Sequence, residues 1–170
     1  CLSYGGYHAV HVPTDQDATD KENLRKRDDH KLALKKIKQQ INAFCLRHGY
    51  IYGGHKWTIK HLEWLKKLDL SELNRETLNE YMTSYEEQTA KIERFDKRIE
   101  ELAADSDYHE NVRKLSCLLG IQTYTALSLI VETGDFKRFR KGNTYAAFLG
   151  LAPGESSSGE KISRTGITKA

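Results

Sequence analysis

The spacing of hydrophobic residues along the chain first indicates long helices. From about Asp20 to His48, apolar side chains recur at alternating steps of three and four residues, which places them on one face of a helix. These residues are Leu34, Ile37, Ile41 and Phe44. Gly49 follows directly and suits the position after a helix end, where the backbone often turns left-handed. The pattern therefore predicts a helix over 20–48.

A second periodic segment is longer. Ser71 or Asn74 suits its start, and a ladder of seven apolar or aromatic positions follows: Leu78, Tyr81, Tyr85, Ile92, Phe95, Ile99 and Leu102. This three-four spacing is typical of a coiled coil. Gln88 interrupts the ladder, and a polar seam residue often fixes the register or the number of helices. The seam needs a partner, either the 20–48 helix in an antiparallel hairpin or a second copy of the chain.

Shorter elements complete the pattern. Residues 50–57 contain glycines and aromatics and read as a loop, after which Thr58 can cap a short helix through about Leu68. Two further short helices are predicted near Tyr124–Glu132 and Thr144–Leu149.

These elements predict a mainly α fold in three parts. Residues 1–19 hold aromatics, glycines and a short alternation, and we interpret them as the tail or linker of a preceding domain. Residues 20–105 form a long helical hairpin or coiled coil. Residues 106–170 form a small helical domain, in which residues 112–151 are rich in Leu, Ile, Ala and Gly.

Charge is distributed unevenly, although the net charge is only +3. Lys and Arg outnumber Asp and Glu by nine to four in residues 20–48 and by seven to two in residues 136–170. The balance is five to ten in residues 71–105. Basic ends around an acidic middle fit a chain whose ends contact a polyanion, and they fit solvated helix faces equally well.

Cysteine usage favours a reducing compartment. The three cysteines, Cys1, Cys45 and Cys117, are odd in number and far apart, so the sequence indicates no disulfide framework. No signal peptide and no membrane-spanning apolar run is recognisable, and we expect a cytoplasmic bacterial protein. The chain begins without a methionine and ends within the basic segment 161–169, so we expect a piece of a longer protein.

The metal-binding residue types form no recognisable site. Cys45 and His48 share a helix face and His55 follows, but the four-ligand spacing of a zinc site is missing. The acids of the second long helix are most simply its solvated face. The sequence therefore predicts no metal ligands.

The first candidate for chemistry is the segment 115–139. A short helix, a tight turn at Gly120-Ile121-Gln122 and a second helix would make a helix-hairpin-helix unit. In such a unit the turn and the following helix N-terminus offer backbone N–H groups to a DNA phosphate, so Gly120, Gln122 and Thr123 are candidate DNA contacts. Gln122 stands where a second glycine is usual, which weakens this cradle, and an ordinary hairpin of the core is the alternative.

The second candidate is the segment 150–170. Ser156, Ser157 and Ser158 precede Gly159 there, and three cations follow: Lys161, Arg164 and Lys169. A serine can act as a nucleophile when a base or metal activates it and cations hold the phosphate. The adjacent glycine lets the backbone approach a phosphodiester. Judged on these residues alone, a plain Ser/Gly linker fits as well.

Four sequence blocks in this half of the chain resemble one family. They are LLGIQTYTALSLIVETGDFKRF, YAAFLGLAP, SSSG and GITKA, in this order and spacing. They resemble the C-terminal domain of bacterial insertion-sequence transposases that join a resolvase-like ribonuclease-H-fold domain to a serine-bearing domain, the RNA-guided bridge recombinases. Residues 1–50, with YHAVHVPT and FCLRHGY, resemble the link between those two domains.

The resemblance implies a mechanism and partners. Four acids of the resolvase-like domain bind magnesium, and a serine of the C-terminal domain attacks a DNA phosphodiester to form a phosphoserine link. The two parts meet across protomers with help from the coiled coil, and a structured noncoding RNA selects the DNA targets. These implications predict DNA, a guide RNA and a second copy of the chain as partners, and no membrane.

The resemblance also suggests which serine reacts. The family's nucleophile directly precedes a glycine shortly after the LAP block, which corresponds to Ser158, with Ser157 and Ser156 as less favoured neighbours. Gly159, Lys161, Arg164 and Lys169 are then DNA contacts. The resolvase-like domain and its magnesium ligands are not in this chain, so we expect the chain alone not to cut DNA.

A rival interpretation requires no catalysis. The chain would then be a dimerising coiled coil with a helix-hairpin-helix that binds the backbone of DNA or RNA. For this chain in isolation, we expect the non-catalytic interpretation to describe its behaviour as well as the enzymatic one does.

Overall fold

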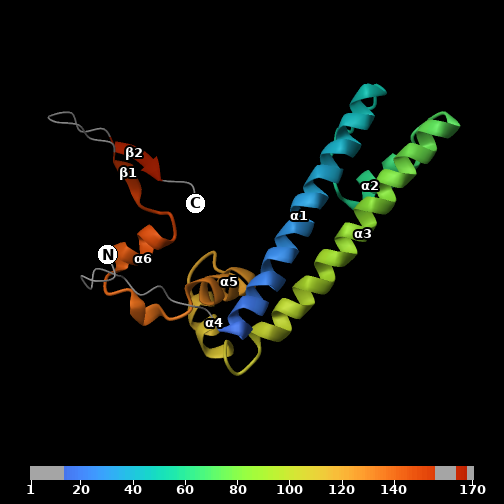
Figure 1. Cartoon of the computed structure of the whole chain (residues 1–170). Helices are drawn as coiled ribbons and strands as arrows, with labels where there is room; N and C mark the ends of the chain where they lie inside the picture. Colours follow the sequence, from blue (N-terminus) through green and yellow to red (C-terminus); the bar gives the residue numbers. More distant parts are fainter. Residues whose placement is uncertain (1–13, 156–163, 168–170) are drawn as a thin grey trace, which may run out of the picture. The chain divides into compact units, whose positions relative to one another are not determined.

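The computed structural model describes residues 14–155 and 164–167, and it confirms the mainly α prediction (Figure 1). The elements in chain order are α1 (Asp15–Arg47), α2 (Ile59–Lys66), α3 (Glu72–Ala103), α4 (His109–Ser116), α5 (Thr123–Thr133), the 3-10 helix η2 (Phe136–Arg138), α6 (Gly142–Phe148), β1 (Pro153–Glu155) and β2 (Arg164–Ile167). They fall into two compact units, one reaching to Glu132 and the other starting at Thr133. In the part of the chain that the structure describes, no helix combines the length and apolarity needed to cross a membrane.

Helices α1 and α3 lie side by side and run in opposite directions (Figure 1). The apolar ladder of α3 faces α1 of the same chain, and Leu78 and Ile99 are only 1% and 2% exposed. The predicted antiparallel hairpin is therefore confirmed, and the partner of the α3 seam is α1. Gln88 of the seam meets a polar partner there, because its side-chain oxygen lies 2.8 Å from Nδ1 of His30.

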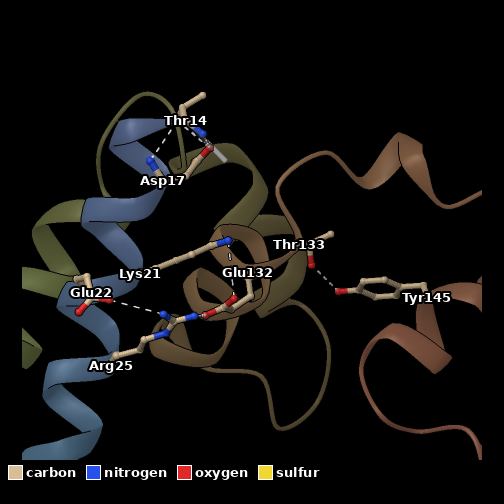
Figure 2. Close-up of polar contacts among 8 residues, drawn as sticks. All are labelled: Thr14, Asp17, Lys21, Glu22, Arg25, Glu132, Thr133 and Tyr145. Atoms are coloured by element: carbon tan, nitrogen blue, oxygen red, sulfur yellow. Dashed lines mark hydrogen bonds and ion pairs between the residues drawn. The ribbon is translucent and has the colours of Figure 1, made fainter. Parts of the chain in front are cut away.

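Helix α1 begins at Asp15, five residues earlier than the sequence pattern suggested. Thr14 caps it: the Thr14 hydroxyl accepts from the Asp17 backbone N–H at 3.1 Å, and the Thr14 N–H donates to the Asp17 carboxylate at 3.2 Å (Figure 2). This reciprocal capping box satisfies backbone donors that a helix start leaves unpaired. Residues 15–19, which we predicted to be linker, therefore belong to the first helix, and residues 1–13 lie outside the described part.

The end of the hairpin that α2 joins has its own core, the connection-end core, formed by Ile41, Phe44, Cys45, Leu65, Leu68, Leu78 and Met82. Trp57 adopts a φ of 67°, in the left-handed region that a non-glycine residue seldom occupies. Its backbone N–H donates to Nδ1 of His61 at 3.1 Å, and its ring stacks on Tyr85 with centroids 5.4 Å apart. These two contacts hold the strained turn that leads into α2.

The other end of the hairpin is closed by α4 and α5. The open-end core there consists of Leu24, Ile99, Ala103, Val112, Ala126, Leu127, Ile130 and Val131. Hydrogen bonds and ion pairs surround the open-end core. Asp20, 4% exposed, accepts from the Tyr108 hydroxyl at 2.7 Å, and Glu132 lies 3.8 Å from Lys21 and 3.4 Å from Arg25 (Figure 2). The compact unit thus continues across residue 105, where the composition changes.

The second unit is built around four aromatic rings. Phe136, Phe139, Tyr145 and Phe148 lie with ring centroids 5.0 to 6.2 Å apart. The Tyr145 hydroxyl is 3.0 Å from Oγ1 of Thr133 (Figure 2). Strands β1 and β2 pair antiparallel, with Pro153 opposite Ile167 and Glu155 opposite Arg164. Helix η2 and both strands were not predicted, because three or four residues are too short to show a period.

Candidate functional site

The predicted helix-hairpin-helix residues come together at the turn between α4 and α5. Gly120 has a φ of +87°, a conformation that L side chains rarely adopt, so glycine is required by the turn itself. The Gln122 carbonyl accepts from the Ala126 N–H at 2.9 Å, and Thr123 opens α5. The expected helix, glycine turn and helix are therefore present.

The surroundings of this turn oppose a phosphate. Gln122 and Thr123 line a cavity of about 220 Å³, and its other lining residues are Tyr124, Arg27, Asp96, Ile99 and Glu100. The Arg27 guanidinium is already paired, with Nε 2.5 Å from the Asp96 carboxylate. Because Asp96 and Arg27 offset each other, Glu100 is the uncompensated charge among the lining residues, and its negative sign disfavours an anion at the start of α5.

The outer side of the same turn is apolar. Leu118 is 56% exposed and Leu119 is 106% exposed, and no cation stands between α4 and α5 in the residues 117–122. The turn therefore offers backbone N–H groups but lacks the positive charge that usually strengthens phosphate contacts.

The predicted nucleophile lies in the connection of a small β-hairpin. Ser156, Ser157 and Ser158, together with Gly159 and Lys161, are in the segment 156–163, outside the described residues, as is Lys169. The strands that flank this segment are described: β1 ends at Glu155, and Arg164 begins β2 as its partner. The serine segment thus lies between β1 and β2 in the sequence.

A basic stretch that the sequence analysis did not assign to any site precedes this hairpin. Lys137, Arg138, Arg140 and Lys141 are all exposed. The Arg138 guanidinium lies 4.6 Å from the ring centroids of both Phe139 and Phe148. The signal that could have revealed the stretch was local: four cations in five residues, with Asp135 as the sole acid between residues 133 and 154.

Of the residues considered for zinc, Cys45 is buried, whereas His48 and His55 are exposed. Cys45 is buried in the connection-end core, where loss of solvation raises the pKa of its thiol, and the nearby Lys56 opposes this shift. His48 contacts the Phe44 ring at a centroid distance of 4.5 Å. Within residues 14–155 and 164–167, no three His, Cys, Asp or Glu side chains are grouped so that they could hold a metal ion.

Comparison with known proteins gives the family. Residues 112–170, from α4 through the serine segment, match the family described as "Transposase IS116/IS110/IS902 family". This segment of the chain therefore belongs to the IS116/IS110/IS902 family of transposases. The match covers both segments singled out above, the glycine turn and the serine-bearing hairpin.

Relatives extend the similarity beyond the family segment. The chain is 32% identical to the putative transposase y4qE of Sinorhizobium fredii, over 99% of this chain and 40% of the relative. It is 32% identical to the transposase for insertion sequence element IS1533 of Leptospira borgpetersenii, over 76% of this chain and 38% of the relative. The chain thus spans about two fifths of the length of these two relatives. No solved structure matches it significantly.

Proposed function

We propose that this chain is the serine-bearing part, with the preceding helical hairpin, of a DNA transposase of the insertion-sequence type. The observation that carries the proposal is the family match over residues 112–170, because that segment contains the serines and the glycine that follows them. The two relatives named above, both transposases by name, support it over most of the chain. The paired strands β1 and β2 add a structural reason, since they anchor both ends of the serine segment.

The reaction that we propose is a transesterification at phosphorus. The Ser158 hydroxyl loses its proton to a base, and its Oγ attacks a DNA phosphodiester. The new Oγ–P bond forms as the P–O bond to one deoxyribose breaks, and the departing oxygen takes up a proton. The phosphodiester energy is kept in the phosphoserine bond, so a second strand can be joined without an external energy source. A serine hydroxyl is a weak nucleophile, so neighbouring cations must stabilise the charge on the phosphate.

Magnesium would be held outside the described part of this chain. The resemblance implies a metal bound by acids of a resolvase-like domain, and the described residues contain no cluster that fits it. We therefore assign this chain the nucleophile and phosphate contacts, and assign no metal ligand to it.

The proposed partners are DNA, a guide RNA and a second copy of the protein. The resemblance implies all three. The structure limits how the copies could meet, because α1 of the same chain already covers the seam of α3. Self-association would therefore use another surface of the hairpin, or an exchange of α1 between copies.

The test is a comparison of serine variants in the complete transposase that carries this sequence. With element-end DNA, the guide RNA and magnesium, the wild type should form a protein–DNA adduct that survives denaturation. Ser158→Ala should abolish the adduct, whereas Ser157→Ala and Ser156→Ala, as matched controls, should keep it. Peptide mapping should find the phosphate on Ser158. A Ser158→Ala variant that still forms the adduct would show that the nucleophile lies elsewhere.

A non-catalytic module is the second candidate function. The observation in its favour is that the described part of the chain contains a helical hairpin whose open end carries α4, the glycine turn and α5. This candidate predicts DNA or RNA binding with no adduct from the wild type or any serine variant. The same assay therefore distinguishes the two candidates.

A further inference from the structure

We propose that the basic stretch Lys137–Lys141 binds the phosphate backbone of nucleic acid, as a site separate from the glycine turn and the serine segment. The inference rests on the proposed function for its ligand class. Its own evidence is the charge, exposure and support of these five residues in the second compact unit.

The charge of the stretch is not neutralised locally. Lys137, Arg138, Arg140 and Lys141 are exposed, and none of them forms an ion pair with another described residue. Asp135 is the sole acid between residues 133 and 154, and its carboxylate accepts from the Lys137 backbone N–H at 2.9 Å. The acid therefore caps η2 through the backbone. Four cations remain available to a polyanion.

The stretch is supported by the aromatic core of its unit. Phe139 lies between Arg138 and Arg140 in sequence, and its ring contacts Tyr145 and Phe148 at 5.0 and 5.1 Å between centroids. The Arg138 guanidinium lies over two of these rings. Cations that are already positioned lose less conformational freedom on binding than cations on a free chain.

The dimensions of the stretch suit several phosphates. Five residues reach at most about 17 Å when fully extended. Phosphates on one strand of duplex DNA follow each other at about 3.4 Å along the helix axis, so about five steps fit this upper limit. The stretch itself is shorter, because Lys137 and Arg138 belong to the 3-10 helix η2, and it suits about three or four phosphates. Phosphate contacts of this kind position a duplex without reading its sequence. The stretch is therefore suited to hold DNA or RNA while other residues select or cut it.

The site differs from the start of α5 in its electrostatics. At the glycine turn, Asp96 and Glu100 face the cavity beside a paired Arg27. At the basic stretch, four cations stand beside Asp135, the sole acid between residues 133 and 154 of the sequence, which accepts a hydrogen bond from the Lys137 backbone N–H. An anion is thus disfavoured at the first place and favoured at the second.

The test measures binding of the chain to a 30-base-pair DNA duplex and to an RNA duplex across salt concentrations. The triple variant Lys137→Gln/Arg140→Gln/Lys141→Gln removes three cations and keeps Arg138, whose packing supports the fold. The matched control is Lys31→Gln/Lys35→Gln/Lys36→Gln, three exposed lysines of α1 without an ion pair among the described residues. Circular dichroism checks that both variants fold.

We expect the triple variant to bind at least tenfold more weakly at 0.1 M salt. The slope of log affinity against log salt should fall by about two to three, because each lost phosphate contact removes about 0.9 from it for duplex DNA. The control should keep the wild-type slope. Equal losses of affinity in both triple variants would mean that net charge alone causes the effect, and would overturn the proposal. The proposal would also be overturned if the Lys137/Arg140/Lys141 variant bound as tightly as the wild type, or if the wild type did not bind. A DNA-only effect would assign the stretch to DNA, and an RNA-only effect to RNA.

The binding experiment and the serine assay test the two proposals independently. An adduct on Ser158 with an unchanged salt slope in the triple variant would refute the basic site alone. A reduced slope without any adduct would support the basic site and refute the catalytic proposal.

Discussion

The side-chain oxygen of Gln88 in α3 lies 2.8 Å from Nδ1 of His30 in α1, midway along the hairpin. The His30 ring also contacts Phe95, with centroids 5.4 Å apart. This polar pair meets at one register of the two helices, because a slip of one turn would move His30 away from Gln88. Both side chains are half-buried, and a polar group that loses its partner there is costly, so the pair favours this register over alternatives.

Gln88→Leu should lower the free energy of unfolding by about 1–3 kcal/mol, because it leaves Nδ1 of His30 without its partner. His30→Leu/Gln88→Leu should recover most of that loss, since an apolar pair suits the seam. Urea denaturation of the two single variants and the double variant gives the coupling energy. Gln40→Leu, at an exposed position of α1, is the control and should change stability little. Additive effects of the two substitutions would refute the coupling.

Tyr108→Phe should destabilise the first unit by about 1–3 kcal/mol, because the buried Asp20 carboxylate loses a hydrogen-bond donor. Burial and the Asp20 contact raise the pKa of Tyr108 above its ordinary value of 10.0. The folded state therefore holds this proton more tightly than the unfolded state. The resulting stability is complete below about pH 10 and is lost as the pH rises further.

The measurement for Tyr108 is unfolding by urea between pH 8 and 11. The wild type should lose stability above pH 10 more steeply than Tyr108→Phe does. Tyr81→Phe is the control, since no described residue is hydrogen bonded to the Tyr81 hydroxyl. Equal slopes for the wild type and Tyr108→Phe would contradict the assignment.

His61→Asn should flatten the acid side of the stability profile. Burial lowers the pKa of His61 below its ordinary value of 6.5, and the nearby Lys56 lowers it further. The unfolded state then takes up a proton before the folded state does, so the stability is present above pH 6.5 and declines as the pH falls below it. Asparagine places an acceptor oxygen near the position of Nδ1 and so can keep the bond from the Trp57 N–H. Thermal unfolding from pH 5 to 8 measures the effect.

His55→Asn is the matched control for the acid profile, because the His55 side chain is exposed. It should leave the pH dependence unchanged. If His61→Asn kept the wild-type decline below pH 6.5, the decline would have to arise from another group.

Leu127→Ala in the open-end core should cost about 2–5 kcal/mol, since it removes a fully buried side chain and leaves a cavity. Leu65→Ala in the connection-end core should cost a similar amount. Chemical denaturation measures both. Leu32→Ala, on an exposed side chain of α1, should have little effect. A small effect of Leu127→Ala would mean that α5 does not pack on the hairpin as described.

Long periodic segments were predictable from the sequence, and short ones were not. The apolar ladder of α3 and the helix that became α1 were visible because many turns repeat one spacing. The start of α1 was missed because Thr14 and Asp17 cap the helix ahead of its first apolar position. Helix η2 and strands β1 and β2 contain three or four residues each, too few for a period.

The sequence segments that make up the candidate site were predictable, but the charges around the glycine turn were not. The glycine turn formed where Gly120 indicated it. Its sequence did not show that Asp96 and Glu100, from a distant helix, would face Thr123 across a cavity. The basic stretch was visible as a charge excess, but the contact of Arg138 with the rings of Phe139 and Phe148 could be seen only in the fold. The assignment of Ser158 remains a prediction.

The hairpin contains two cores that have no residue in common, with the His30–Gln88 pair in the interval between them. Perturbations of stability at sites that share no partner are expected to add. The effect of a substitution at one end of the hairpin on the free energy of unfolding should therefore be the same whether or not the other end is altered. The open end, which carries α4 and α5, and the connection end, which carries α2, can accordingly accumulate sequence changes independently, provided that the polar pair between them is kept.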